Sequence, residues 1–166
     1  MKNQPVIEVP KTALERWLDI FSLLFVALSV ALVATYYSDL PDTIPTHFNG
    51  AGKVDGYGSK NTIFLLPVLS LILVPGILLL SRYPHKFNYL TKITPENAAF
   101  EYKKAQVMVR IMNVLVSALF LLLTWEIVQA ALGRYFGLGP LFWILIVLTL
   151  ILPWAIAFGW KQKKAA

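Results

Sequence analysis

The sequence predicts an all-α membrane protein: four transmembrane helices in an antiparallel bundle, with a structured extracytoplasmic loop between helices 1 and 2. Hydrophobic residues make up 57% of the 166 residues and charged residues only 14%, which is more apolar than soluble domains are. Four apolar runs are each long enough to cross about 30 Å of hydrocarbon, which takes roughly 20 helical residues. A soluble fold of this size could not hide so much apolar surface.

The four runs form a single transmembrane domain over residues 1–166. Each run is expected to be helical, because a helix satisfies its backbone hydrogen bonds internally in lipid. The first run exceeds the 7–15 residues of a signal-peptide core and no small-x-small site follows it, so it is expected to stay as a helix. In chain order the predicted spans are about 17–37, 63–81, 107–132 and 141–160.

The third helix is expected to start before its apolar run. Thr94 is a preferred N-cap residue, Pro95 suits the first helical position and Glu96 places an acid in the first turn. The helix should therefore begin near Pro95 and project beyond the membrane. Farther along the same helix, Arg110 is expected to pair with Asp19 of the first span, because both lie about one turn into the lipid on the same side.

Basic residues predict the orientation. Twelve of the 15 Lys and Arg residues lie in the two terminal tails or in and just after the segment 82–106, and three lie in the other two connections. The excess of Lys and Arg marks the cytoplasmic side, so both termini and the segment 82–106 are expected in the cytoplasm and the loop 38–62 outside it. The net charge of +6 comes from basic residues that lie beside apolar runs. The expected partner is therefore the lipid bilayer of the cytoplasmic membrane and not nucleic acid.

The loop 38–62 is the most unusual part of the chain. Residues 40–60 contain two prolines and four glycines, which favour tight turns and a compact loop. Residues 45–48 are expected to form a short strand, followed by a turn at Asn49-Gly50.

Polar side chains in and below this loop form the candidate ligand-binding set. An imidazole, an amide, a carboxylate, a hydroxyl and an ammonium fall within 14 positions, and a carboxylate in the outer part of the third helix should lie just beneath them, within reach of the basic groups. The set is His47, Asn49, Asp55, Ser59, Lys60 and Glu126. It could bind a peptide or a lipid headgroup, or it could simply cap the bundle. One histidine with one carboxylate is too few ligands for zinc, so no metal or cofactor is predicted, and no residue is assigned a catalytic role.

The loop also resembles a known family pattern. Its fixed elements are Leu40-Pro41, Ile44-Pro45, His47-Phe48-Asn49, Gly52, Asp55 and Tyr57-Gly58-Ser59-Lys60. This pattern resembles that of the domain-of-unknown-function 1648 (DUF1648) family, as do residues 84–89, Thr94–Asn97 and Tyr102. The resemblance implies a small bacterial multi-span protein. The same domain occurs at the N-terminus of the immunity protein against the sporulation-delaying toxin, but this chain is shorter and is expected to lack its second portion.

Three functional hypotheses follow. In the first, the protein is a receptor or immunity-type module: the outer loop with Glu126 binds an extracellular peptide or lipid headgroup, and the segment 82–106 engages a cytoplasmic partner. In the second, it is a membrane enzyme or transporter with a polar site formed by His47, Asp55 and Glu126. In the third, it is a structural subunit of a larger complex, with small residues on the first span that allow close helix approach. Those residues are Ala27, Ser29, Ala31 and Ala34.

Overall fold

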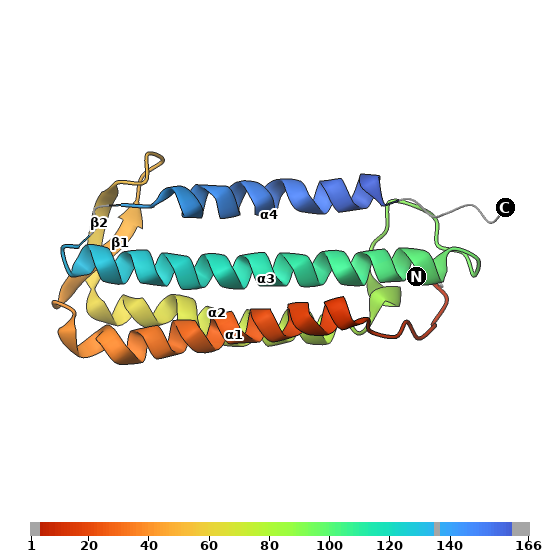
Figure 1. Cartoon of the computed structure of the whole chain (residues 1–166), viewed down its shortest axis with the longest axis horizontal. Coiled ribbons are helices and arrows are strands. Elements are labelled where there is room, and N and C mark those ends of the chain that lie inside the picture. Colours follow the sequence, from red (N-terminus) through yellow and green to blue (C-terminus); the bar gives the residue numbers. More distant parts are fainter. Residues whose placement is uncertain (1–3, 135–136, 161–166) are drawn as a thin grey trace.

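Four long helices lie side by side along one axis, and successive helices run in opposite directions (Figure 1). The computed structural model describes residues 4–134 and 137–160. Four helical segments are long and apolar enough to cross a membrane, and the second of them covers residues 60–80. The predicted fold class is therefore confirmed, and the protein is a multi-pass membrane protein. The helices are α1 (Ala13–Tyr36), α2 (Leu65–Leu80), α3 (Ala98–Ala131) and α4 (Pro140–Gly159).

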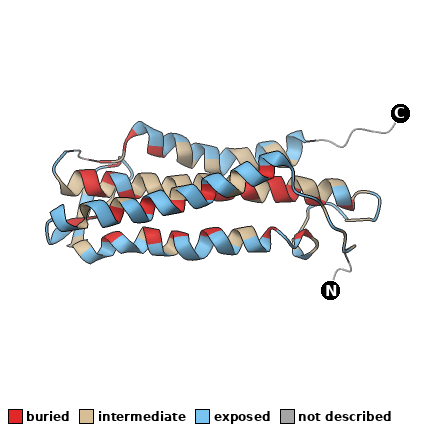
Figure 2. Cartoon of the chain, turned by 60° about the horizontal axis from the view of Figure 1, so that its bottom comes forward, coloured by how far each residue is buried: buried red, intermediate tan, exposed pale blue. Residues whose placement is uncertain are grey.

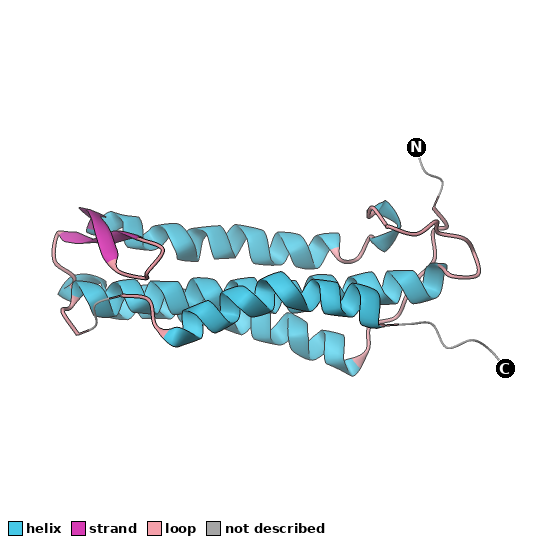
Figure 3. Cartoon of the chain, turned by 90° about the horizontal axis from the view of Figure 1, so that it is seen from above, coloured by secondary structure: helices cyan, strands magenta, loops and turns pink. Residues whose placement is uncertain are grey.

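The two ends of the bundle are built differently. At one end, called the hairpin end, strands β1 (Thr43–Phe48) and β2 (Val54–Ser59) form an antiparallel pair, drawn in magenta in Figure 3. At the other, called the tail end, the N-terminal segment 4–12 meets the connection 81–97 between α2 and α3. Three short 3-10 helices complete the fold: η1 (Tyr37–Asp39), η2 (Lys60–Phe64) and η3 (Pro84–Lys86).

Helix α3 is the centre of the bundle. It packs against α1, α2 and α4, whereas α4 packs mainly against α3. Buried residues accordingly run along α3 and along the sides of α1 and α2 that face it (Figure 2). Several of them are polar: the Asn113 amide donates to the carbonyl of Val74 in α2 (3.3 Å), and the hydroxyls of Ser29 and Thr124 lie 3.4 Å apart. Such bonds hold helices together where the surrounding lipid cannot.

The start of α3 differs from the prediction. Residues 95–97 form a turn, and α3 begins at Ala98, three residues after Pro95. Asn97 closes this turn, because its side-chain oxygen accepts a hydrogen bond from the Thr94 backbone N–H (2.8 Å). Even so, the 34 residues of α3 span about 51 Å. This exceeds the hydrocarbon thickness of about 30 Å, so the helix projects beyond the membrane as predicted.

The loop between the strands contains the predicted turn at Asn49-Gly50, because the Gly52 N–H donates to the Asn49 carbonyl (2.8 Å). The strands are joined by five residues, 49–53, with Gly52 in the left-handed region at φ +76°. The predicted strand is present and is two residues longer at its start than expected.

Candidate functional site

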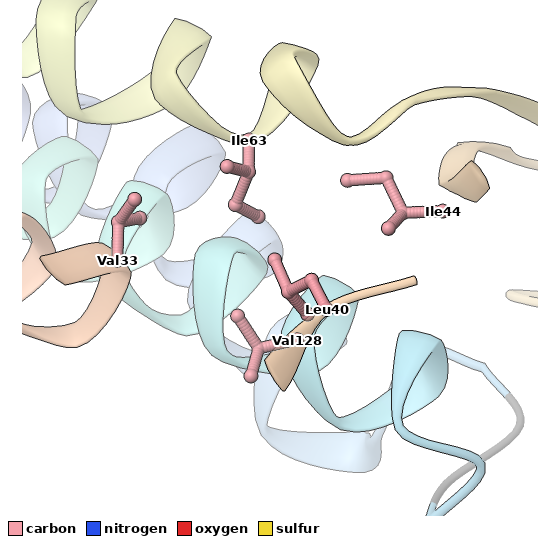
Figure 4. Close-up of a cluster of buried hydrophobic side chains, with 5 residues drawn as sticks. All are labelled: Val33, Leu40, Ile44, Ile63 and Val128. Atoms are coloured by element: carbon pink, nitrogen blue, oxygen red, sulfur yellow. The ribbon is translucent and has the colours of Figure 1, made fainter. Parts of the chain in front are cut away.

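An apolar cluster fixes the hairpin to the bundle. Ile44 of β1 is fully buried and packs with side chains from α1, the η1–β1 connection, η2 and α3 (Figure 4). Burying an isoleucine of this kind stabilises a fold by about 1.5–3 kcal/mol. The hairpin is therefore a fixed part of the bundle end. The other members of the cluster are Val33, Leu40, Ile63 and Val128.

Asn49 and Gly52 shape the tip of the hairpin. The side-chain oxygen of Asn49 accepts hydrogen bonds from the backbone N–H groups of Ala51 (2.9 Å) and Lys53 (3.1 Å). The carbonyl of Gly52 accepts one from Leu138 (2.7 Å), in the segment that leads into α4. A Cβ on Gly52 would lie 3.2 Å from the Leu138 Cβ, so the close approach favours glycine. Asn49 therefore closes the loop on itself, and Gly52 joins it to the α3–α4 connection.

Ser59 and Lys60 tie the base of the hairpin to its surroundings. The Ser59 hydroxyl accepts a hydrogen bond from Asn61 N–H (3.3 Å) at the start of η2. The Lys60 ammonium lies 3.3 Å from a carboxylate oxygen of Asp42 and 5.4 Å from the ring centre of Tyr37. Both predicted site residues thus have local structural partners.

Glu126 lies beneath the hairpin end but is bonded to α4. It is 5% exposed, and its Oε1 accepts a hydrogen bond from Gly139 N–H (2.8 Å), at the N-cap of α4. A carboxylate is favourable there because a helix N-terminus carries partial positive charge. The second oxygen, Oε2, and the Gln129 amide nitrogen have no hydrogen-bond partner among the described residues. The expected contact was a basic group of the loop; the observed one is a backbone N–H.

Comparison with known proteins assigns this region to a family model. Residues 24–71 match the model described as "Domain of unknown function (DUF1648)". The match runs from α1 through the hairpin into α2. An uncharacterized protein of Archaeoglobus fulgidus (strain ATCC 49558) is 29% identical over 150 residues, which cover 79% of this chain and 80% of that protein. No solved structure shows a significant match.

Within the matched residues 24–71, the structure brings together His47 and Asp55. The two lie on neighbouring strands, and His47 Nδ1 is hydrogen-bonded to a carboxylate oxygen of Asp55. Their side chains are 70% and 41% exposed, and Tyr57 on the same face of β2 is 66% exposed. Gly56 makes the arrangement possible, because a Cβ there would lie 2.8 Å from the His47 Cβ. Of the six predicted residues, His47 and Asp55 are the two whose side chains bond to each other, and both are exposed.

A second polar cluster lies at the tail end, outside the matched residues 24–71. Arg110 is 1% exposed, and its Nε donates to Asp19 Oδ1 (3.0 Å), which confirms the predicted pair. Its Nη1 also donates to Glu15 (3.2 Å), which is fully buried and was not predicted. Two lysines complete the network: Lys103 with Glu15 and Lys11 with Asp19, each at 2.6 Å.

Two sequence features could have revealed Glu15. Thr12 and Glu15 have the spacing of a capping box, and the structure contains that box at the start of α1. Glu15 and Asp19 are also four residues apart, which places both carboxylates on one side of a helix. The predicted span began at residue 17, so Glu15 was assigned to the tail and left without a partner.

Proposed function

We propose that this protein is a receptor or immunity-type membrane module that binds an extracellular peptide through the outward face of its hairpin. The observation that supports it is the exposed group of His47, Asp55 and Tyr57 on a strand pair whose inner side is fixed to the bundle. A preformed surface loses little conformational freedom on binding, which favours affinity. Tyrosine is also among the residues that contribute most to interfaces.

The strand pair offers a further mode of binding. A two-stranded sheet leaves backbone groups unpaired along its edges, and an extended peptide can add to such an edge. The peptide is favoured over a lipid headgroup for this reason. The distribution of basic residues supports an extracytoplasmic position for the hairpin.

The tail end supports a role for the segment 82–106 as the contact for a cytoplasmic partner. Leu90 is 89% exposed in the connection between α2 and α3, and the exposed Lys86 and Lys92 lie on either side of it in sequence. An exposed apolar side chain between basic residues suits a partner with a small acidic surface. This part of the proposal is supported if the Leu90→Ser variant pulls down less of such a partner than the wild type does. Leu14→Ser, at another exposed leucine, is the control and should pull down as much as the wild type.

The other two hypotheses are less well supported. An enzyme or transporter site would need Glu126 to act together with His47 and Asp55, yet Glu126 is buried and bonded to Gly139 while the other two are exposed. A structural subunit is the second candidate. Three of its four small residues, Ala27, Ala31 and Ala34, are exposed on α1, whereas Ser29 is buried against α3.

Orientation is tested first. The chain has no cysteine, so single cysteines can be introduced without a background, at Ala51 in the hairpin loop and at Thr91 in the opposite connection. A membrane-impermeant maleimide should label Ala51→Cys in intact cells and Thr91→Cys only after permeabilisation. The reverse pattern would exclude extracellular binding by the hairpin.

Binding is tested with the purified protein in lipid nanodiscs of neutral phosphatidylcholine. Peptides selected from a display library should bind at least about tenfold more weakly to the variant His47→Ala/Asp55→Ala. Lys53→Ala, an exposed change at the hairpin tip, is the matched control. Equal binding by both variants would contradict the proposal. Recovery of anionic vesicles but no peptide would indicate a lipid headgroup as the ligand.

A further inference from the structure

A cavity of about 440 Å³ lies at the tail end, on the opposite side of the protein from the hairpin. Its walls come from residues 6–11 and 82–85, and Gln106 and Arg110 of α3 also line it. Figure 1 shows these segments gathered at one end of the bundle, beside the label of the N-terminus. The cavity is independent of the proposed peptide-binding face.

Arg110 brings an unsatisfied donor to this cavity. Its Nε and Nη1 are engaged by Asp19, Glu15 and the backbone carbonyl of Gln106 (3.1 Å). Its Nη2 has no hydrogen-bond partner among the described residues, although the side chain is 99% buried. Buried polar groups are nearly always bonded to protein, water or ligand. A guanidinium nitrogen with two N–H groups suits a phosphate or carboxylate oxygen.

The charge around the cavity favours an anion. Three cations of the cluster, Arg110, Lys11 and Lys103, are paired with only two carboxylates, so positive charge is in excess. Arg82 adds a further guanidinium to the wall, opposite the single wall carboxylate of Glu8. Arginine forks recognise phosphate oxygens in pairs.

Gln106 supplies a hydrogen-bond acceptor to the same cavity. Its amide nitrogen donates to the carbonyl of Ser81 (3.2 Å), so its oxygen is the free end of the amide. That oxygen is buried and has no partner among the described residues. Gln106 and Arg110 are four residues apart and therefore lie on the same face of α3. A ligand that contacts both side chains must therefore carry anionic oxygens for Arg110 and a hydrogen-bond donor for Gln106.

We infer that this cavity binds a phosphate ester that carries a hydroxyl group. The phosphate oxygens accept hydrogen bonds from Arg110 and Arg82, and the hydroxyl donates to the Gln106 side-chain oxygen. Two sources have this chemistry: the headgroup of phosphatidylglycerol and soluble glycerol phosphate. Trp17, 58% exposed on α1 two residues after Glu15, is the type of residue that lies at headgroup level, so a lipid could reach the cavity.

The test uses the full chain with three soluble probes and one lipid. Glycerol 3-phosphate, methyl phosphate and inorganic phosphate are titrated against the protein in phosphatidylcholine nanodiscs. Phosphatidylglycerol retained by the purified protein is measured by native mass spectrometry. Arg82→Ala should weaken binding about tenfold, because a hydrogen bond to a charged group is lost. Gln106→Leu should abolish the preference for glycerol 3-phosphate over methyl phosphate. Lys53→Ala at the hairpin end should change neither the affinity nor the preference for glycerol 3-phosphate.

Each outcome has a defined meaning. Retention of lipid with no soluble binding assigns the site to a headgroup, and the reverse assigns it to a soluble ester. If the protein neither retains the lipid nor binds a soluble ester, the proposed site is wrong. The same follows if Lys53→Ala weakens binding as much as Arg82→Ala does. An unchanged preference in Gln106→Leu would overturn the hydroxyl contact. Arg110→Lys should also weaken binding; if that variant does not fold, Arg82→Ala and Gln106→Leu still decide the result.

Discussion

The two ends of the bundle use polar residues in opposite ways. At the hairpin end, polar residues that are close in sequence remain close in space, and those of the motif mostly satisfy local backbone and side-chain partners. At the tail end, charged residues far apart in sequence meet in one buried network. Arg110 and Glu15, which are 95 positions apart, are 1% and 0% exposed in that network, whereas His47 is 70% exposed.

This difference separates conspicuous residues from energetically important ones. A motif of glycine, proline and asparagine attracts attention because it is dense, yet much of it serves to form a turn and to join it to the α3–α4 connection. A buried ion cluster is scattered through the sequence, but breaking it removes hydrogen bonds from charged groups that are out of water. Five substitutions test this contrast.

The largest effect is expected from Arg110→Met. The change removes the partner that Glu15 and Asp19 share, although each carboxylate keeps one lysine. We expect a loss of about 3 kcal/mol, the lower end of the range for breaking a buried pair. Unfolding in mixed micelles of increasing SDS content measures the loss. Lys60→Met at the hairpin end is the control, because its partner Asp42 is 97% exposed and such pairs contribute about 0–1 kcal/mol. Equal losses at both ends would remove the contrast.

The second effect is expected at Gly52. Alanine at φ +76° is strained by about 1–2 kcal/mol, and its Cβ would press on Leu138 at 3.2 Å. Gly52→Ala should therefore lower the free energy of unfolding by at least that amount in the same assay. Gly50→Ala is a matched control two residues away in the same loop, with nothing within 4 Å of an added Cβ. A stable Gly52→Ala variant would mean that the tip does not depend on this contact.

Asn49→Ala should have a smaller effect. It removes the acceptor of two backbone N–H groups in a partly exposed loop, which typically costs about 1 kcal/mol. The same unfolding assay applies, with exposed Asn88→Ala at the tail end as the control. Hydrogen exchange of the Ala51 and Lys53 amides should rise in the Asn49 variant and stay constant in the control. Unchanged exchange would show that the side chain does not hold the loop.

The smallest effect on stability is expected from His47→Ala and Asp55→Ala. Exposed ion pairs contribute about 0–1 kcal/mol, and these side chains are 70% and 41% exposed. Both variants should therefore unfold close to the wild type while losing peptide binding. A loss above about 2 kcal/mol would assign the pair a structural role and weaken the case for a binding face.

Sequence reasoning was most successful where one local pattern decides the structure. Apolar run length predicted α1, α2 and α4 to within a few residues. An apolar segment of that length in lipid must bond its own backbone groups, and a helix does so. The start of α3 lies three residues after the predicted Pro95, because the side chain of Asn97 closes a turn there. The turn predicted at Asn49-Gly50 is present, but the contact between Gly52 and Leu138 could not be inferred from local sequence.

The sequence by itself determined that this chain crosses a bilayer about four times and carries a compact proline- and glycine-rich loop, because run length and backbone restriction are local properties. Apart from the predicted pair of Asp19 and Arg110, only the tertiary structure decided which polar groups are buried together. Glu126 is directed to the start of α4, Glu15 joins Arg110, and Gln106 and Arg110 line one cavity. These contacts depend on how the helices pack around α3, and packing is set by all of their faces at once.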